Sequence, residues 1–251
     1  MKHSKREDKI NIEIENSQKL PEPATIGAII PSAGLSIRLP GCTKKQFRYL
    51  NGKPIVLHAL ERLISYRMLK YISLVLPENE LDSVVIPNNS YVDLKVVSGG
   101  LDRKSSVENG LKILPEEVKW VVIHDGVRPF LTKDLVKRCL LESYHTGASL
   151  AAFKISDTLK LSDEKKFTLQ TISRKNVWSA QTPQVVRREL LEKAYKEFQE
   201  HNSEITDESS LLEKIGVKSR IVISNKMNIK ITTQEDLLLA EFYLKQEKNL
   251  N

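Results

Sequence analysis

Short apolar runs alternate with amphipathic stretches along most of the chain. The compact apolar runs, which are typical of buried strands, lie at residues 25–31, 71–76, 94–97 and 120–124. Apolar positions recur at helical spacing after Pro54, over residues 104–113 and after Thr132, which we expect to be an N-cap. This order predicts an α/β fold: a Rossmann-like, doubly wound, mixed but mostly parallel sheet with helices on both faces.

The alternation changes character at residues 157–174. Leu159 and Leu161 alternate with polar residues, a polar turn follows at 162–166, and Phe167 and Leu169 alternate again. This pattern predicts a protruding β-hairpin arm. Because an isolated hairpin is marginally stable in water, we expect a second subunit to cover it.

Further elements follow the arm. We expect a helix near residues 187–200, a short helix after Asp207, a strand at 219–224 and a terminal helix. Thr232 and Glu235 have the spacing of a capping box at the start of that last helix.

The two ends of the chain differ in composition. Residues 1–24 are polar, carry both signs of charge and lack the apolar core of a signal sequence, so we interpret them as an extension. Residues 25–251 are expected to form one domain, with the arm at about 157–174. No apolar run approaches the length that spans a bilayer, which predicts a cytoplasmic protein without membrane contact.

Charge and cysteine content narrow the function. The net charge is +7, but the basic residues are spread along the chain and aromatic residues make up only 6%, so a nucleic-acid stripe is not predicted. A small anionic ligand would use several of these charges locally. The two cysteines, Cys42 and Cys139, exclude a disulfide framework, and we expect Cys139 in the core.

Ligands of a doubly wound sheet bind at the carboxyl ends of its strands. The first such loop, residues 31–38 (PSAGLSIR), offers small residues and then Arg38, followed by Lys45 and Gln46. Small residues let backbone N–H groups approach phosphate, and fixed cations suit a triphosphate. A solvated basic loop would have the same composition.

Two further strand ends carry candidate residues. Gly99 and Gly100 would allow a base to lie against the backbone, although they also suit a flexible turn with Ser106 near a helix start. Asp125 is a hard oxygen ligand suited to Mg²⁺. Arg128 could hold a second phosphate or pair with Asp125. Lys230 would by itself be interpreted as a surface lysine, and it becomes a candidate only together with the other residues named here.

Taken together, these segments resemble the 2-C-methyl-D-erythritol 4-phosphate cytidylyltransferase family of the non-mevalonate isoprenoid pathway. The matching stretches run in order from about residue 25 to the last helix: 31–38, 45–46, 99–106, 124–129, 157–158, 178–184 (WSAQTPQ), 205–208 (ITDE) and 228–232 (NIKIT). The resemblance implies transfer of CMP from CTP to the phosphate of 2-C-methyl-D-erythritol 4-phosphate (MEP), with Mg²⁺ and release of pyrophosphate.

The resemblance also implies residue roles. The positive groups around the triphosphate and the transition state would be Arg38, Lys45 and Lys230. The cytidine positions would be Ala33, Gly34, Gly100, Leu101 and Ser106. Asp125 would lie near Mg²⁺ and substrate. The substrate pocket would include Arg128, Thr182 and Thr206, whereas Thr158 and Arg174 would reach the neighbouring subunit's site in a homodimer.

Some positions depart from the family pattern. Lys44 replaces a proline, Ser32 an alanine and Ser36 a glycine, and Leu101 stands where an acid is common. Lys226 and Met227 precede Asn228 where some relatives have an acid, which leaves Asp125 as the clear metal-side carboxylate.

Two other functions compete with this one. A pentitol phosphate cytidylyltransferase, acting on ribitol 5-phosphate, resembles the same loops and would also suit residues 50–55 (LNGKPI). The ITDE segment, Asp157 with Thr158, and Trp178 favour the methylerythritol substrate. A non-catalytic nucleotide- or RNA-binding module would bind without turnover and with steep salt dependence.

Overall fold

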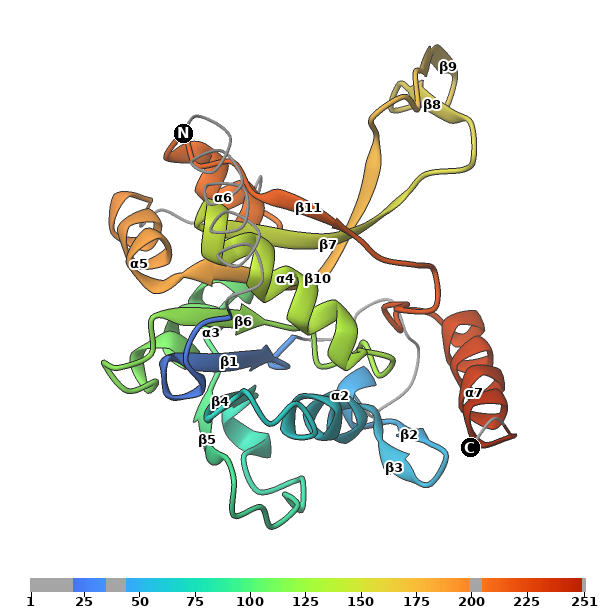
Figure 1. Ribbon diagram of the computed structural model, residues 1–251. Helices are drawn as coiled ribbons and strands as arrows, with labels where there is room; N and C mark the ends of the chain where they lie inside the picture. The colour runs from blue at the N-terminus through green and yellow to red at the C-terminus, as the bar shows by residue number, and fades with distance from the viewer. Residues whose placement is uncertain (1–19, 35–43, 199–204, 250–251) are drawn as a thin grey trace, which may run out of the picture.

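A seven-stranded sheet forms the centre of the computed structural model, which describes residues 20–34, 44–198 and 205–249 (Figure 1). Its order is β11-β7-β10-β6-β1-β4-β5, and every pairing is parallel except the two made by β10. The predicted mixed, mostly parallel sheet is therefore confirmed. The strands are β1 (Ile26–Pro31), β4 (Tyr71–Leu76), β5 (Asp93–Ser98), β6 (Trp120–Ile123), β7 (Ala148–Lys154), β10 (Trp178–Arg187) and β11 (Arg220–Ile223).

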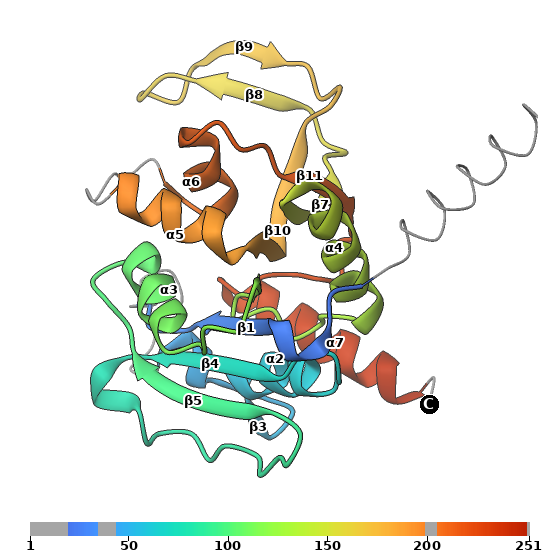
Figure 2. The same ribbon diagram turned by 60° about the vertical axis from the view of Figure 1, so that its left-hand side comes forward.

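Helices cover both faces of this sheet, as predicted (Figure 2). On one face the apolar sides of α2 (Ile55–Ile64) and α4 (Lys133–Thr146) pack against alternate residues of β1, β4 and β6. On the other face α3 (Arg103–Lys112), α5 (Arg188–Glu197) and α6 (Glu208–Lys214) pack against the residues between them. The period-two alternation of each buried strand is what supplies two apolar faces.

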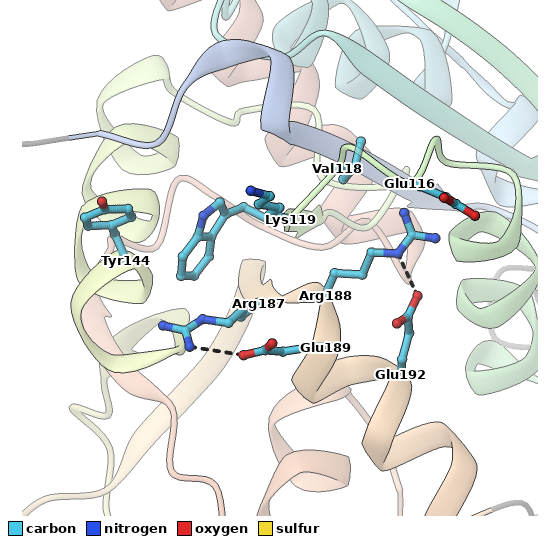
Figure 3. Close-up of a pocket in the computed structure, with 9 residues that line it drawn as sticks. Glu116, Val118, Lys119, Tyr144, Arg187, Arg188, Glu189 and Glu192 are labelled. Carbon is cyan, nitrogen blue, oxygen red and sulfur yellow. Dashed lines mark hydrogen bonds and ion pairs between the residues drawn. The ribbon is translucent and has the colours of Figure 1, made fainter.

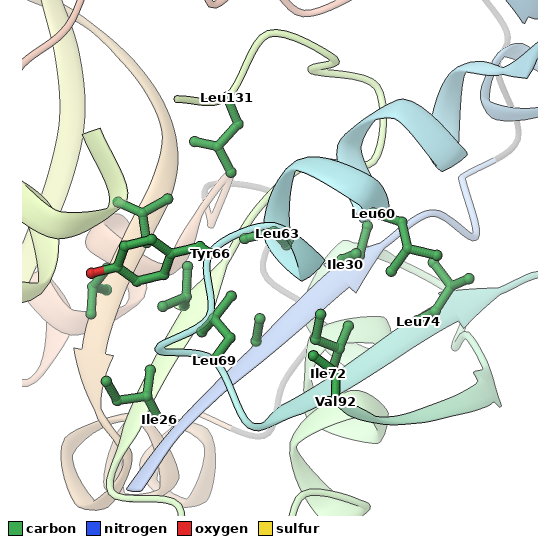
Figure 4. Packing of buried hydrophobic residues seen from close by; sticks show 14 of the residues in the cluster. Ile26, Ile30, Leu60, Leu63, Tyr66, Leu69, Ile72, Leu74, Val92 and Leu131 are labelled. Carbon is green, nitrogen blue, oxygen red and sulfur yellow. The ribbon is translucent and has the colours of Figure 1, made fainter. Parts of the chain in front are cut away.

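The larger core cluster lies beneath α2 and α4. Figure 4 shows Leu60 and Leu63 of α2 near Ile30, Ile72 and Leu74 of the sheet. All five side chains are almost completely buried. Burying one such aliphatic side chain stabilises the fold by roughly 1.5–3 kcal/mol, so this contact anchors the strands whose ends form the site.

The helix starts follow the expected chemistry, with one correction. The hydroxyl of Thr132 accepts from the N–H of Leu135 and caps α4, as predicted. The capping box of α7 (Gln234–Asn249) is Thr233 with Asp236, one residue later than the predicted pair: Asp236 accepts from the N–H of Thr233, and Thr233 accepts from the N–H of Asp236. Two adjacent threonines precede this helix, and the register of the helix selects the second.

The arm forms as a separate two-stranded sheet of β8 (Leu159–Ser162) and β9 (Thr168–Ile172). It projects away from the central sheet (Figure 1). Its apolar side chains Leu161, Phe167, Leu169 and Ile172 are exposed.

Smaller elements complete the described chain. A hairpin of β2 (Tyr49–Leu50) and β3 (Lys53–Pro54) lies between η2 (Lys45–Phe47) and α2. Short helical turns also form at η1 (Pro23–Thr25) and η3 (Glu78–Glu80). Cys139 is buried and free, as expected for a core residue. None of the helices in the described ranges is both long and apolar enough to cross a membrane. Residues 1–19 of the expected extension, and Cys42, lie outside the described residues.

Candidate active site

The carboxyl ends of β1, β5 and β6 open onto a cavity of about 530 Å³. These are the strand ends at which the sheet topology places ligands. The lining also includes Lys45 from η2 and Lys230 from the segment before α7. It consists of Pro31, Ser32, Ala33, Gly34, Lys45, Gln46, Gly100, Leu101, Asp102, Arg103, Ser106, Asp125, Val127 and Lys230.

Two small-residue loops meet on one wall of the cavity. A Cβ added at Gly99 would lie 2.1 Å from the Cβ of Ala33, so only glycine permits this approach of the loops after β5 and β1. Ser106 fixes the loop after β5, because its hydroxyl accepts from the N–H of Gly100 at 3.1 Å and donates to the carbonyl of Asp102 at 2.7 Å. The wall is therefore built from backbone, which is suited to a flat base or a phosphate chain.

Gln46 joins η2 to the loop after β1. Its buried amide donates to the carbonyl of Ser32 at 2.7 Å and to that of Gly34 at 3.3 Å. This contact places the neighbouring Lys45, which belongs to η2 and not to a strand of the sheet, on the cavity wall. The sequence analysis named Gln46 beside Lys45 without a role of its own, and the structure supplies that role.

Asp125 lies at the centre of a cationic cluster. Its Oδ2 is 3.0 Å from Nζ of Lys230 and 3.2 Å from Nε of Arg128, and its Oδ1 is 3.5 Å from Nη2 of Arg103. Burial opposes ionisation of this carboxyl, but the attraction of Arg103, Lys230 and Arg128 is stronger and holds the pKa of Asp125 far below its usual range. The carboxylate is therefore charged at every physiological pH.

A directional hydrogen-bond chain fixes the backbone at Asp125. The Nε2 of His124 lies 3.0 Å from the carbonyl oxygen of Arg128, which can only accept, so the proton is on Nε2. The hydroxyl of Thr182 then donates to Nδ1 of His124 and accepts from the N–H of Asp125, both at 3.0 Å. Burial lowers the pKa of His124 to about 4, which keeps this ring neutral.

The strand β10 ties the remaining segments to this centre. The buried Arg128 donates to the carbonyl of Asn228 at 2.8 Å, and Gln181 donates to the same oxygen at 3.1 Å. Gln184 donates to Asp207 at 2.7 Å and accepts from the N–H of Ser209 at 2.9 Å. The buried glutamines of the WSAQTPQ stretch thus hold the NIKIT and ITDE segments beside the cavity.

The predicted site residues fall into distinct groups. Arg128 and Thr182 are buried behind the cavity and contact Asp125 from within, and Thr206 lies on a small neighbouring cavity. Thr158 and Arg174 flank the two strands of the arm, and neither lines the cavity around Asp125. Arg38 lies outside the described residues. The predicted residues that line the cavity are Ala33, Gly34, Lys45, Gly100, Leu101, Ser106, Asp125 and Lys230.

Sequence reasoning missed Arg103 and Glu208. Arg103 lines the cavity and pairs with Glu208 of the ITDE segment through two hydrogen bonds of 2.5 and 2.9 Å. The available signal was an arginine beside a glycine-rich loop and a glutamate in the ITDE segment, 105 residues apart. Only the fold brings the two together.

The donor set fits a Mg²⁺ ion that arrives with a triphosphate. No cluster of three or more His, Cys, Asp or Glu side chains suited to a metal exists among the described residues. Asp102 lines the cavity, but its carboxylate caps α3 through Ser105. Because Mg²⁺ commonly binds through one or two carboxylates plus substrate phosphates, Asp125 is the protein ligand that the described residues of this cavity offer.

A second cavity of about 770 Å³ lies at the opposite end of β6 (Figure 3). Its arginines are paired with acids of α5: Arg187 with Glu189 at 3.1 Å and Arg188 with Glu192 at 2.6 Å. Arg187 also lies over the ring of Trp120. This larger cavity is at the wrong end of the parallel strands for substrate and offers balanced charge, so the cavity around Asp125 is the candidate active site.

Comparison with known proteins agrees with this geometry. The model of the 2-C-methyl-D-erythritol 4-phosphate cytidylyltransferase family matches residues 26–246. Proteins of that name from Syntrophus aciditrophicus and Shouchella clausii are 37% and 40% identical over 225 residues, which span 88% of this chain and 96% and 97% of theirs. The crystal structure of the Francisella tularensis protein of that name aligns with a TM-score of 0.76 and 32% identity, covering 87% of this chain and 99% of its own.

Proposed function

Because this chain belongs to the 2-C-methyl-D-erythritol 4-phosphate cytidylyltransferase family, we propose that the cavity around Asp125 holds both substrates of its reaction. The protein is a nucleotidyltransferase that transfers CMP from CTP to MEP. The products are 4-diphosphocytidyl-2-C-methyl-D-erythritol and pyrophosphate, and the reaction serves isoprenoid precursor synthesis. The observation that carries the site assignment is the meeting of Lys45, Lys230 and Asp125 with the glycine-rich wall in one cavity.

The reaction needs charge stabilisation more than proton transfer. The attacking phosphate oxygen of MEP is already ionised at neutral pH, so no general base is required. It forms a bond to the α-phosphorus of CTP while the bond to the pyrophosphate oxygen breaks. Two anions must meet, and negative charge increases on the leaving group, so preorganised cations lower the barrier.

We assign that task to Lys45 and Lys230, together with Arg38. Lys230 is 36% exposed and reaches the cavity from beside Asp125, which holds its ammonium at 3.0 Å. The cytidine would lie on the wall made by Ala33, Gly34, Gly100, Leu101 and Ser106, where backbone groups can read the base. Thr206 would contact MEP, whereas Arg128 and Thr182 act from behind the cavity by fixing Asp125.

We extend the proposal to Mg²⁺ as the cofactor, held by Asp125 and the phosphates of CTP. When bound, such an ion neutralises part of the triphosphate charge. Asp125 meanwhile holds the ammonium of Lys230 at the cavity wall. Removal of the metal with a chelator should abolish turnover, and added Mg²⁺ should restore it.

We also propose a homodimer joined through the arms. The support is the separate two-stranded sheet with four exposed apolar side chains, together with Thr158 and Arg174 at the base of the arm. Replacing Phe167 and Leu169 together by serine should shift the protein to a monomer in sedimentation and reduce turnover. Val85→Ser, which changes an exposed apolar residue elsewhere, is the control. A dimer that persists in the double variant would exclude this interface.

We place the reaction in the cytoplasm, where CTP is made and used. Fractionation of the source cells with an antibody to this chain would test the location. Recovery of the protein in a membrane or secreted fraction would contradict it.

Two single variants test the charge clamp. Lys45→Ala and Lys230→Ala should each lower kcat by about 100-fold or more, because each removes a donor aimed at the developing charge. Lys53→Ala is a matched control: Lys53 is 37% exposed and pairs with Glu61 at 2.6 Å, much as Lys230 pairs with Asp125. Near-normal turnover of both active-site variants in folded protein would refute the clamp.

The same assay separates the substrates. Pyrophosphate release is measured with CTP and Mg²⁺ in the presence of MEP or of ribitol 5-phosphate. Release with MEP alone is expected. Release with ribitol 5-phosphate alone would assign the site to pentitol phosphates instead.

A further inference from the structure

The pair formed by Arg103 and Glu208 joins two helix starts at the edge of the active site. Arg103 is the first residue of α3 and Glu208 the first residue of α6. Each helix begins with an aspartate N-cap and a serine at the third position, which form complete capping boxes. Each helix start is therefore fixed by its own capping box, independently of the contact between the two side chains.

The pair is buried in an asymmetric way. The side chain of Glu208 is 2% exposed, whereas that of Arg103 is 27% exposed and faces the cavity. Burial disfavours the charge on Arg103, but Glu208 and Asp125 attract it more strongly, and the pKa of Arg103 is raised above its ordinary value. A carboxylate this deeply buried needs a partner, and the bidentate guanidinium supplies it.

Arg103 also touches the carboxylate that organises the site. Among the ion pairs that described residues make with Asp125, the one on Oδ1 comes from Arg103, at 3.5 Å, whereas Arg128 and Lys230 lie on Oδ2. Cations on both oxygens oppose rotation of the carboxylate about its Cβ–Cγ bond. Without Arg103, the ion pairs from the described residues would hold Oδ2 and not Oδ1.

The two cavities of this region share Arg103. It lines the cavity around Asp125 and also the small neighbouring cavity that Thr206 lines. Arg103 thus stands between the segment proposed to contact MEP and the loop proposed to bind CTP.

We infer that Arg103, held by Glu208, is a positioning residue that orients Asp125 and couples the ITDE segment to the nucleotide loop. This inference rests on the proposed site around Asp125. Arg103 acts through Asp125 and makes no bond to the reacting atoms, so its loss should reduce kcat more than CTP binding.

The test separates positioning from stability. Arg103→Met leaves Glu208 buried without a partner, and we expect Tm to fall by about 10 °C. Arg103→Met combined with Glu208→Leu removes both charges, which should restore Tm to within about 3 °C. In both proteins kcat should remain about 10- to 100-fold below wild type, the usual effect of losing a supporting contact, with the KM for CTP within about threefold.

A milder variant covers the case in which the double variant does not fold. Glu208→Gln keeps the shape of the side chain and removes its charge, and kcat should fall about tenfold. The control is Arg188→Met with Glu192→Leu, which deletes a more exposed ion pair within α5, away from the cavity around Asp125, and should change kcat less than twofold.

Recovery of kcat in the stable Arg103→Met/Glu208→Leu protein, or unchanged kcat in Glu208→Gln, would overturn the inference. Lys230→Ala in the same assay distinguishes this from failure of the proposed site. If Lys230→Ala kept full turnover, the site assignment itself would be wrong. If Lys230→Ala were inactive while the Arg103 variants were normal, only the positioning role would be lost.

Discussion

Acid should destabilise this protein through His124, well above the pH at which carboxylates are protonated. The ring is fully buried, and both of its nitrogens are used: Nε2 donates to the carbonyl of Arg128, and Nδ1 accepts from Thr182. A second proton on Nδ1 would place a charge in this buried position, and the attraction of the nearby Asp125 does not offset that cost. The folded state therefore selects the neutral ring.

The magnitude follows from the two pKa values. An unfolded histidine titrates near 6.5, and the folded pKa of His124 is about 4. Each pKa unit corresponds to about 1.36 kcal/mol, so the difference is worth about 3 kcal/mol. Between these values the unfolded chain binds a proton that the folded protein does not bind. The stabilisation is consequently complete above pH 6.5 and is lost as the pH falls towards 4.

Urea unfolding followed by tryptophan fluorescence at pH 7.0, 6.0, 5.0 and 4.5 measures the effect. The free energy of unfolding should decrease with falling pH in wild type and decrease less in His124→Asn. His145→Gln, which changes an exposed histidine, should leave the dependence unaltered. Partial burial also lowers the pKa of His58, so His58→Gln measures its share of the slope. An equal pH dependence in wild type and His124→Asn would refute the reasoning.

Three further outcomes are expected. Asp125→Asn should lower kcat by about 100-fold or more, because it leaves the surrounding cations unopposed and misplaced; pyrophosphate release measures this, and near-normal turnover would contradict it. Gly126→Ala should destabilise by about 1–3 kcal/mol, since its Cβ would lie 1.9 Å from Oγ of Ser32, and adding Ser32→Ala should recover part of the loss in urea unfolding. Thr233→Ala should cost about 1 kcal/mol of stability while Glu235→Ala costs less, and the reverse order would restore the originally predicted capping box.

Strands made mostly of apolar residues could be predicted from the sequence. The strands β7 and β10 could not, although β10 carries the polar residues that support the site. The run 71–76 was predicted to the residue because five of its six residues are apolar or aromatic and Lys70 and Pro77 bound it. The strand β7 (Ala148–Lys154) is rich in alanine and serine, which have little strand preference. The strand β10 contains Pro183, which lacks an N–H for the ladder and argues against a central strand.

Burial of polar side chains also hid β10 from sequence reasoning. Three polar side chains of β10 are almost fully buried: Gln181, Thr182 and Gln184. A strand buried on both faces is expected to carry apolar residues at such positions. The three polar side chains are tolerated because each has found hydrogen-bond partners in segments distant along the chain. Such partners are invisible until the topology is known. The hairpin of β2 and β3, in contrast, has a local signal, because Asn51 and Gly52 form its two-residue turn and both adopt positive φ.

The sequence indicated single candidate residues of the site, but it did not indicate how their side chains are arranged. Asp125 stood out because a carboxylate at the end of a buried strand is exposed to substrate by the topology. Its three cations come from the start of α3, from the turn after β6 and from the segment before α7. A lone aspartate would suggest a metal ligand and nothing more. With Arg103 on one oxygen and Arg128 and Lys230 on the other, the carboxylate also gathers positive charge at the cavity wall. On the proposed function, that charge would let two phosphorylated substrates approach each other, which would account for an acid at this position of an anion-binding site.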